Sequence, residues 1–137
     1  MGNRKDCRKT TQGRATMHAE RTASENRISA CRTQAKSTNL WERRISIIAT
    51  GWFIWRDDFP DTLRIAEKLL GDREDLIHKA AGWMLREIGK RDEAVLEEFL
   101  AEHCRVMPRT MLRYAIERLP QKKWQGYMGR KMRIPTQ

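Results

Sequence analysis

The chain has 137 residues, which is enough for one domain of ordinary size. Its composition is rich in charge, with 34% charged and 39% hydrophobic residues, and no apolar run reaches the roughly 18 residues of a membrane-spanning helix. The amino terminus lacks the apolar core of a signal peptide, so we expect a cytoplasmic protein. The three cysteines share no CxxC spacing, which argues against a disulfide framework or a zinc site and predicts neither metal nor cofactor.

The formal net charge of +10 is unevenly distributed along the chain. Residues 1–38 hold nine Lys/Arg and three Asp/Glu, and Ile28 is their only large aliphatic residue. Such a segment buries too little apolar area to offset its ordering entropy, so residues 1–37 are predicted to be a disordered basic leader. Two alternatives are a basic arm that engages DNA and the product of a shifted reading frame.

A series of helices is predicted after this leader, each starting at a capping residue or a proline that precedes an apolar face. The first is expected to run to about Arg56 and the second to stop at Gly71. Residues 130–137 are predicted to be a basic tail. The expected starts are Asn39, Asp58, Asp72, Asp92, Pro108 and Pro120.

Odd-numbered helices of this series begin near residues 38, 72 and 107, and no window alternates with period 2. A helix pair that recurs every 34 or 35 residues is typical of an α-solenoid. The predicted fold is therefore all-α, a right-handed superhelix of about three HEAT-like helix pairs over residues 38–129. The first helix of such an array should expose an apolar flank.

The segment from Asp75 to Asp92 shows the clearest pattern in the chain. At 100° per residue its aliphatic side chains fall on one arc, while Lys79, Trp83, Arg86 and Lys90 fall on the opposite arc. Cations that flank an exposed indole suit nucleic acid, which offers phosphates and flat bases. The alternative is that Trp83 packs on a neighbouring helix and the cations are only solvated.

Arg44 lies at the centre of an apolar arc on the first predicted helix, among Leu40, Ile48, Gly51 and Trp55. A charge in that position is costly unless its head group reaches a partner. An ion pair with a carboxylate such as Asp75 or Glu87 is one solution, and a ligand phosphate is another.

Residues 39–50 (NLWERRISIIAT) and 79–90 (KAAGWMLREIGK), with 108–117 (PRTMLRYAIE), follow one another at a characteristic separation. In these motifs the chain resembles the DNA alkylation repair family, the AlkD-like DNA glycosylases, over about residues 36–128. That range corresponds to the carboxy-terminal part of a family member. The resemblance implies HEAT-like repeats with a concave cationic face for duplex DNA and excision of N3- or N7-alkylated purines without a metal. It also implies that Trp83 contacts the damaged nucleotide and that Arg44 grips the DNA backbone.

One expected part of the family's machinery is missing. The catalytic carboxylate should come from a tryptophan–aspartate segment before Asn39, where this chain offers only Asp6, Glu20 and Glu25. The catalytic residue is therefore unknown, and the sequence suggests a truncated member.

Three functions follow from these patterns. The first is a base-excision glycosylase for alkylated duplex DNA, or a remnant of one, in the cytoplasm and on the nucleoid. The second is a non-catalytic HEAT-like module that binds duplex DNA. The third is a scaffold that binds protein, or a second copy of itself, through Trp41, Ile45, Ile48 and Trp52. The expected DNA-binding residues are Arg44, Lys79, Trp83, Arg86 and Lys90.

Overall fold

The computed structural model describes the backbone of residues 9–130 and side chains from residue 17 onward, His18 excepted. Within that part of the chain all regular structure is helical, which confirms the all-α prediction. The elements are α1 (Lys9–Gln34), α2 (Leu40–Ala49), α3 (Gly51–Ile54), α4 (Pro60–Lys68), the 3-10 turn η1 (Leu69–Gly71), α5 (Asp75–Arg91), α6 (Glu93–His103), α7 (Arg109–Ile116) and α8 (Gln121–Met128).

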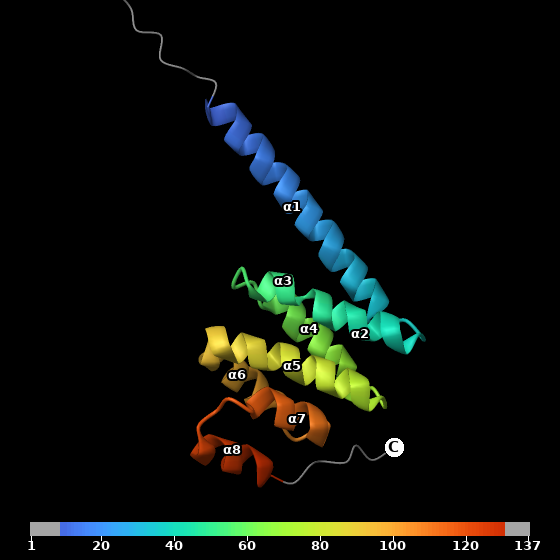
Figure 1. Cartoon of the computed structure of the whole chain (residues 1–137), viewed down its shortest axis with the longest axis vertical. Helices are drawn as coiled ribbons and strands as arrows, with labels where there is room; N and C mark the ends of the chain where they lie inside the picture. The colour runs from blue at the N-terminus through green and yellow to red at the C-terminus, as the bar shows by residue number, and fades with distance from the viewer. Residues whose placement is uncertain (1–8, 131–137) are drawn as a thin grey trace, which may run out of the picture.

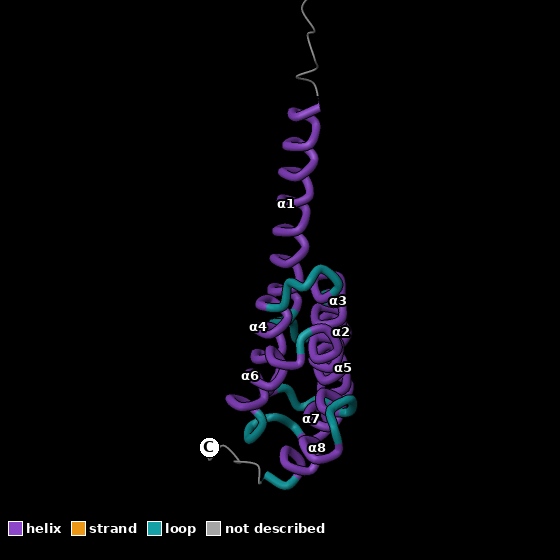
Figure 2. Tube along the Cα trace, turned by 90° about the vertical axis from the view of Figure 1, so that its left-hand side faces the viewer, coloured by secondary structure: helices purple, strands orange, loops and turns teal. Residues whose placement is uncertain are grey.

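The helices stack in two layers (Figures 1 and 2). Helices α2, α3, α5 and α7 form one layer, and α4 and α6 form the other. Helices α2, α5 and α7 begin at residues 40, 75 and 109, so successive members of the first layer start 35 and then 34 residues apart. The predicted periodicity is thus present in the helix order, while the handedness of a superhelix stays a prediction.

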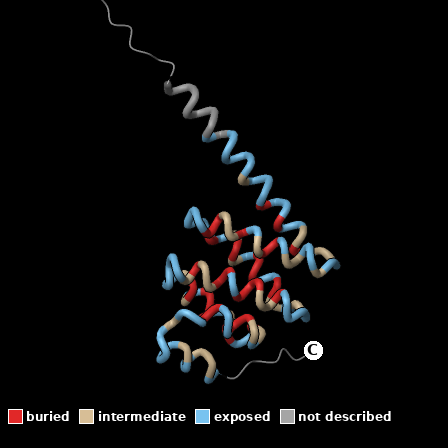
Figure 3. Tube along the Cα trace, in the orientation of Figure 1, coloured by how far each residue is buried: buried red, intermediate tan, exposed pale blue. Residues whose placement is uncertain are grey.

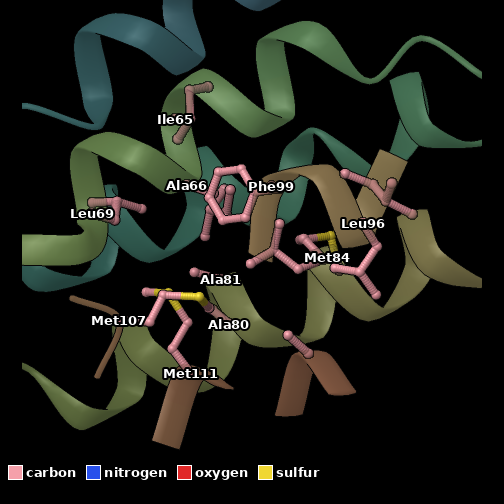
Figure 4. Close-up of a cluster of buried hydrophobic side chains, with 14 of the residues drawn as sticks. Ile65, Ala66, Leu69, Ala80, Ala81, Met84, Leu96, Phe99, Met107 and Met111 are labelled. Atoms are coloured by element: carbon pink, nitrogen blue, oxygen red, sulfur yellow. The ribbon is translucent and has the colours of Figure 1, made fainter. Parts of the chain in front are cut away.

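The core lies between the two layers, with α5 at its centre (Figures 3 and 4). The predicted apolar stripe of α5 is buried in full, and Ile65 and Ala66 of α4 with Phe99 of α6 face it from the other layer. Burying a large aliphatic side chain contributes roughly 1.5–3 kcal/mol. The buried stripe of α5 consists of Ile77, Ala80, Ala81, Met84, Leu85 and Ile88.

Helices α5 and α7 approach each other closely at Gly82. A Cβ atom placed there would lie 2.5 Å from the main-chain oxygen of Met111 and 2.6 Å from the Cβ of Tyr114. Neither atom belongs to the flexible end of a side chain, so only glycine fits at this crossing. The glycine of the Gly-Trp-Met motif therefore sets how close the two helices lie.

Several helix boundaries agree with the predictions and others differ. Asn39 caps α2 through the amide of Trp41, and Asp92 caps α6 through the amides of Ala94 and Val95, as predicted. The first predicted helix is instead divided, because α2 ends at Ala49 and α3 begins at Gly51. The hydroxyl of Thr50 donates to the carbonyl of Ile47 across 2.6 Å, which tightens the last turn of α2.

Two predicted starts are wrong by one to three residues. Phe59 rather than Asp58 occupies the N-cap position of α4, and α5 begins at Asp75 rather than just after Asp72. Asp72 instead accepts the amide of Glu74 across 3.0 Å in the turn before α5. A short turn therefore uses the Asp72 side chain that the sequence assigned to a cap.

The prediction of a disordered leader is wrong for residues 9–34, which form α1. Ile28, Cys31 and Ala35 are buried at the end of α1 and in the turn after it, and α1 packs on α2. Their spacing of three and four residues is helical, but one aliphatic residue and two small ones give a weak hydrophobic signal. An ion pair between Arg32 and Asp61 of α4 adds a second attachment. Residues 1–8 and residues 131–137 of the predicted tail lie outside the described residues.

Candidate nucleic-acid interface

A groove lined by three tryptophans runs between α2–α3 and α5. We call it the tryptophan groove, and its volume is about 440 Å³. Trp55 and Trp83 are 75% and 40% exposed, which is unusual for so large an apolar surface. The groove is therefore open to a ligand and is not part of the core. Its lining residues are Ile48, Gly51, Trp52, Trp55, Trp83, Met84 and Glu87.

Glu87 is the charged group of this groove. Its carboxylate accepts the indole N–H of Trp83 across 3.1 Å and the ammonium of Lys90 across 2.8 Å. Burial raises the pKa of Glu87, but the hydrogen bond and charge of Lys90, the Trp83 indole and the charge of Arg86 together hold that pKa below its ordinary value. An ionised carboxylate thus lies beside the exposed ring of Trp83 at neutral pH.

Trp52 already has cationic partners from its own chain. The guanidinium of Arg56 lies 4.1 Å from the centre of the indole ring and that of Arg27, from α1, lies 4.9 Å from it. Phe53 also meets the ring edge-on, with ring centres 5.0 Å apart. These contacts hold Trp52 in place and leave Trp55 and Trp83 as the more accessible rings.

The predicted cationic row of α5 is largely compensated by carboxylates. Lys79 pairs with Asp75 across 2.9 Å, Lys90 pairs with Glu87, and Arg86 pairs with Glu117, the residue that follows α7. The sequence did not indicate these carboxylate partners. Any phosphate that binds to this row must compete with them.

Arg44 differs from these three cations. Its guanidinium donates to the main-chain oxygen of Leu76 across 2.8 Å, and within the described part of the chain it has no carboxylate within 4.0 Å. The predicted ion pair with Asp75 or Glu87 does not form, and these carboxylates pair with Lys79 and Lys90. Arg44 thus keeps an uncompensated charge next to the groove wall.

The neighbouring Arg43 has a structural role. Its Nε donates to Asp72 across 2.7 Å, and its Nη1 donates to the carbonyls of Ser37 and Thr38 across 3.0 and 2.9 Å. Arg43 therefore joins the α1–α2 connection to the turn before α5. Of the two arginines in the Glu-Arg-Arg motif, Arg43 therefore stabilises the fold, while Arg44 faces outward.

A second cavity of about 440 Å³ lies on the other side of α5, between α5, α7 and α8. Arg86 lines this second cavity and not the tryptophan groove. The remaining lining residues are Arg113, Tyr114, Glu117 and Trp124. Of the five predicted binding residues, Trp83 lines the tryptophan groove and Arg86 lines the second cavity. The other three, Arg44, Lys79 and Lys90, line neither.

The tryptophan groove was not predicted from the sequence, although the residues of one of its walls were identified. The arc of Ile48, Gly51 and Trp55 was identified around Arg44, and it forms one wall of the groove instead of a buried helix face. Trp52 and Glu87 complete the groove because α3 turns beside α5. The exposed flank predicted for the first helix is also present, with Trp41 and Ile45 59% and 56% exposed.

Residues 17–130 also define what the structure offers for metal binding, thiol chemistry and membrane insertion. No group of three His, Cys, Asp or Glu side chains there is arranged to hold a metal ion. Cys31 and Cys104 are both buried as free thiols. None of the described helices is long and apolar enough to cross a bilayer.

Comparison with known proteins gives one match. The family model of the DNA alkylation repair enzymes matches residues 9–119, which is most of the chain. The protein therefore belongs to the DNA alkylation repair enzyme family and has a role in DNA repair. The match begins in α1, so the prediction that the resemblance starts near residue 36 and covers only a carboxy-terminal part is wrong. A search of curated proteins and a search of solved structures returned no match.

Proposed function

We propose that this chain binds alkylated duplex DNA through the tryptophan groove and excises N3- or N7-alkylated purines in base-excision repair. Family membership and the exposure of Trp55 and Trp83 beside the ionised Glu87 carry the proposal. A purine alkylated at N7 is flat and carries a positive charge. Indole faces and a carboxylate attract that combination.

The proposed contacts follow from which cations are available. Arg44 would bind the DNA backbone directly, since its charge has no carboxylate partner among the described residues. Lys79 and Lys90 would contribute by exchanging Asp75 and Glu87 for phosphate oxygens, and Arg86 would contribute from the adjoining cavity. Such exchange makes binding strongly dependent on salt. We further propose HEAT-like repeats as the frame of this surface and the cytoplasm, including the nucleoid, as its location.

The chemistry would be hydrolysis of the N-glycosidic bond. The bond electrons leave with the alkylated base, water adds to C1′ of the sugar, and one proton is released. A carboxylate near the sugar stabilises the positive charge that develops there. Between Lys9 and Asn39 the carboxylates are Glu20 and Glu25, and Glu25 lies on α1 within 3.4 Å of Arg21. We infer that Glu87, which lines the groove, is the carboxylate available for this role.

The test measures release of 7-methylguanine from methylated duplex DNA by the purified chain. Trp55→Ala should weaken DNA binding about 5- to 150-fold, because loss of one stacking face costs roughly 1–3 kcal/mol. Trp41→Ala is the matched control, since Trp41 is similarly exposed but lies outside the groove. Equal losses in both variants would argue against the groove as the binding site.

The second candidate is a DNA-binding module without glycosylase activity. It is favoured by the absence of a tryptophan–aspartate pair between Lys9 and Asn39. Salt-sensitive binding to duplex DNA without release of the methylated base would establish it. A scaffold that binds protein or a second copy through Trp41 and Ile45 is the remaining alternative. It would give concentration-dependent mass in sedimentation and no DNA binding.

A further inference from the structure

The second cavity, between α5, α7 and α8, has features of a site in its own right. Its volume of about 440 Å³ falls within the range of small-molecule sites, roughly 300–1,000 Å³. It shares no lining residue with the tryptophan groove. Its lining is charged and aromatic, with two arginines, one glutamate, a tyrosine and a tryptophan.

The charges in this cavity favour an anion. Arg86 pairs with Glu117, but its Nε is buried and has no hydrogen-bond partner among the described residues. The carboxylate of Glu87 is 3.9 Å from that nitrogen, which is too far for a hydrogen bond. Arg113 is exposed and makes no ion pair within residues 17–130. The cavity lining thus holds one carboxylate and two guanidinium groups, and one of these groups has a buried nitrogen without a partner among the described residues.

The aromatic residues of the cavity add a flat surface. Trp124 of α8 is partly buried, and Tyr114 of α7 is 36% exposed. Both residues line the cavity together with the two arginines. A ligand that matches this cavity therefore carries both an oxyanion and a planar ring.

We propose that this cavity binds a nucleotide, with the phosphate on Arg113 and Arg86 and the base against Trp124 and Tyr114. Guanidinium groups bind phosphate oxygens in a bidentate manner, and aromatic side chains stack on bases. Glu117 acts as an internal competitor, since it occupies Arg86 until a phosphate replaces it. The ligand is either a free nucleoside monophosphate or one nucleotide of a DNA strand.

The proposal goes beyond duplex DNA binding and does not require it. Arg86 is the only residue that the two proposals share, so the test is built on Arg113 and Glu117. Arg113 is exposed, and its replacement should leave the fold intact. Arg118 is also exposed and does not line the cavity, which makes it the matched control.

The experiment titrates adenosine 5′-monophosphate, inorganic phosphate and adenosine into the full chain by isothermal calorimetry. The monophosphate should bind more tightly than either fragment. Arg113→Ala should weaken its affinity on the order of 10- to 100-fold, because a hydrogen bond to a charged group is lost. Arg118→Ala should leave the affinity unchanged. Glu117→Gln should tighten binding, since the competitor for Arg86 is removed.

Two results would overturn the proposal: equal affinity of adenosine and its monophosphate, or an Arg113→Ala variant that binds as tightly as the parent chain. A short single-stranded oligonucleotide then identifies the source of the ligand. If it displaces the monophosphate, a strand nucleotide occupies the cavity; if it does not, the ligand is a free nucleotide. Trp55→Ala should bind the monophosphate normally, so loss of duplex DNA binding alone would count only against the tryptophan groove.

Discussion

The indole N–H of Trp83 donates to a carboxylate oxygen of Glu87 one helical turn further along α5, across 3.1 Å. Two residues at i and i+4 lie on the same face of a helix, so this bond forms within α5 and needs no other element. It fixes the orientation of an exposed indole and places a negative charge at its edge. The indole of Trp83, the most accessible aromatic face of α5, is therefore already oriented before any ligand binds.

Replacing Glu87 with Gln should slow excision of the alkylated base while leaving DNA binding intact. The Gln oxygen can still accept the Trp83 indole N–H, so the ring should keep its orientation and DNA binding should persist. Release of the alkylated base should fall by about 100-fold or more, because a fixed charge at the reacting centre is lost. Single-turnover release of 7-methylguanine measures this effect.

Glu98→Gln is the control for charge alone, since Glu98 lies on α6 in the other layer. Unchanged release by Glu87→Gln would exclude Glu87 as the catalytic carboxylate.

The adjacent arginines 43 and 44 should behave in opposite ways. Arg43→Ala leaves the poorly exposed Asp72 without its partner and should lower the free energy of unfolding by about 3 kcal/mol. Arg44→Ala removes one proposed phosphate contact and should reduce the salt slope of DNA binding by about 0.9. Its stability should change by less than about 1 kcal/mol.

Chemical denaturation and filter binding at several salt concentrations measure both properties for each variant. A stability loss in Arg44→Ala as large as that in Arg43→Ala would show that both arginines are structural.

Gly82→Ala should destabilise the fold, because its methyl group would collide with the backbone of Met111 and the Cβ of Tyr114. Forcing atoms into a packed helix crossing costs typically 1–3 kcal/mol. Gly51→Ala is the matched control, since a Cβ there meets only the sulfur of Met84 at 3.6 Å. That variant should be neutral or slightly more stable, and thermal unfolding followed by circular dichroism compares the two. Equal stability of both variants would contradict the close approach of α5 and α7.

The stability of the protein should fall in acid through Asp72. Burial raises the pKa of this carboxyl, but hydrogen bonds from the Glu74 amide and Arg43, with the nearby charges of Arg43 and His78, hold the pKa below its ordinary value. A carboxyl whose pKa is lower in the folded state stabilises the protein above its unfolded pKa, about 3.9. That stabilisation is lost as the pH falls through the folded pKa.

Asp72→Asn should therefore be less stable than the parent chain at pH 7, and the difference should shrink below about pH 4. Urea denaturation between pH 7 and pH 3 measures this convergence. A difference that stays constant over that range would show that the Asp72 charge contributes nothing.

Much of the fold could be predicted because local signals agree with packing along α5 and α6. The apolar stripe of α5 and the cap at Asp92 each depend on residues within one helix. Helix α1 could not be predicted in the same way. Its buried residues Ile28 and Cys31, with Ala35 in the turn after it, form too small an apolar surface to stand out against a polar background.

The site was only partly predictable because its partners are distant in sequence. Trp83 was predicted on the cationic face of its helix and Arg44 at the centre of an apolar arc, and the structure places Trp83 in the groove. The groove itself requires α3 to lie beside α5, and the pairing of Arg86 with Glu117 joins residues 31 positions apart. Such contacts arise from the stacking of helices and leave no periodic signal in the sequence.

The 26-residue helix α1 leaves the stack at one end and packs on α2 only near its carboxyl terminus (Figures 1 and 3). At 1.5 Å per residue it is about 39 Å long. A long helix that extends from a small body makes rotational diffusion anisotropic, with slower tumbling about axes perpendicular to the helix. Amide relaxation rates should therefore depend on helix orientation, and α1 should differ in this respect from any helix that runs across it.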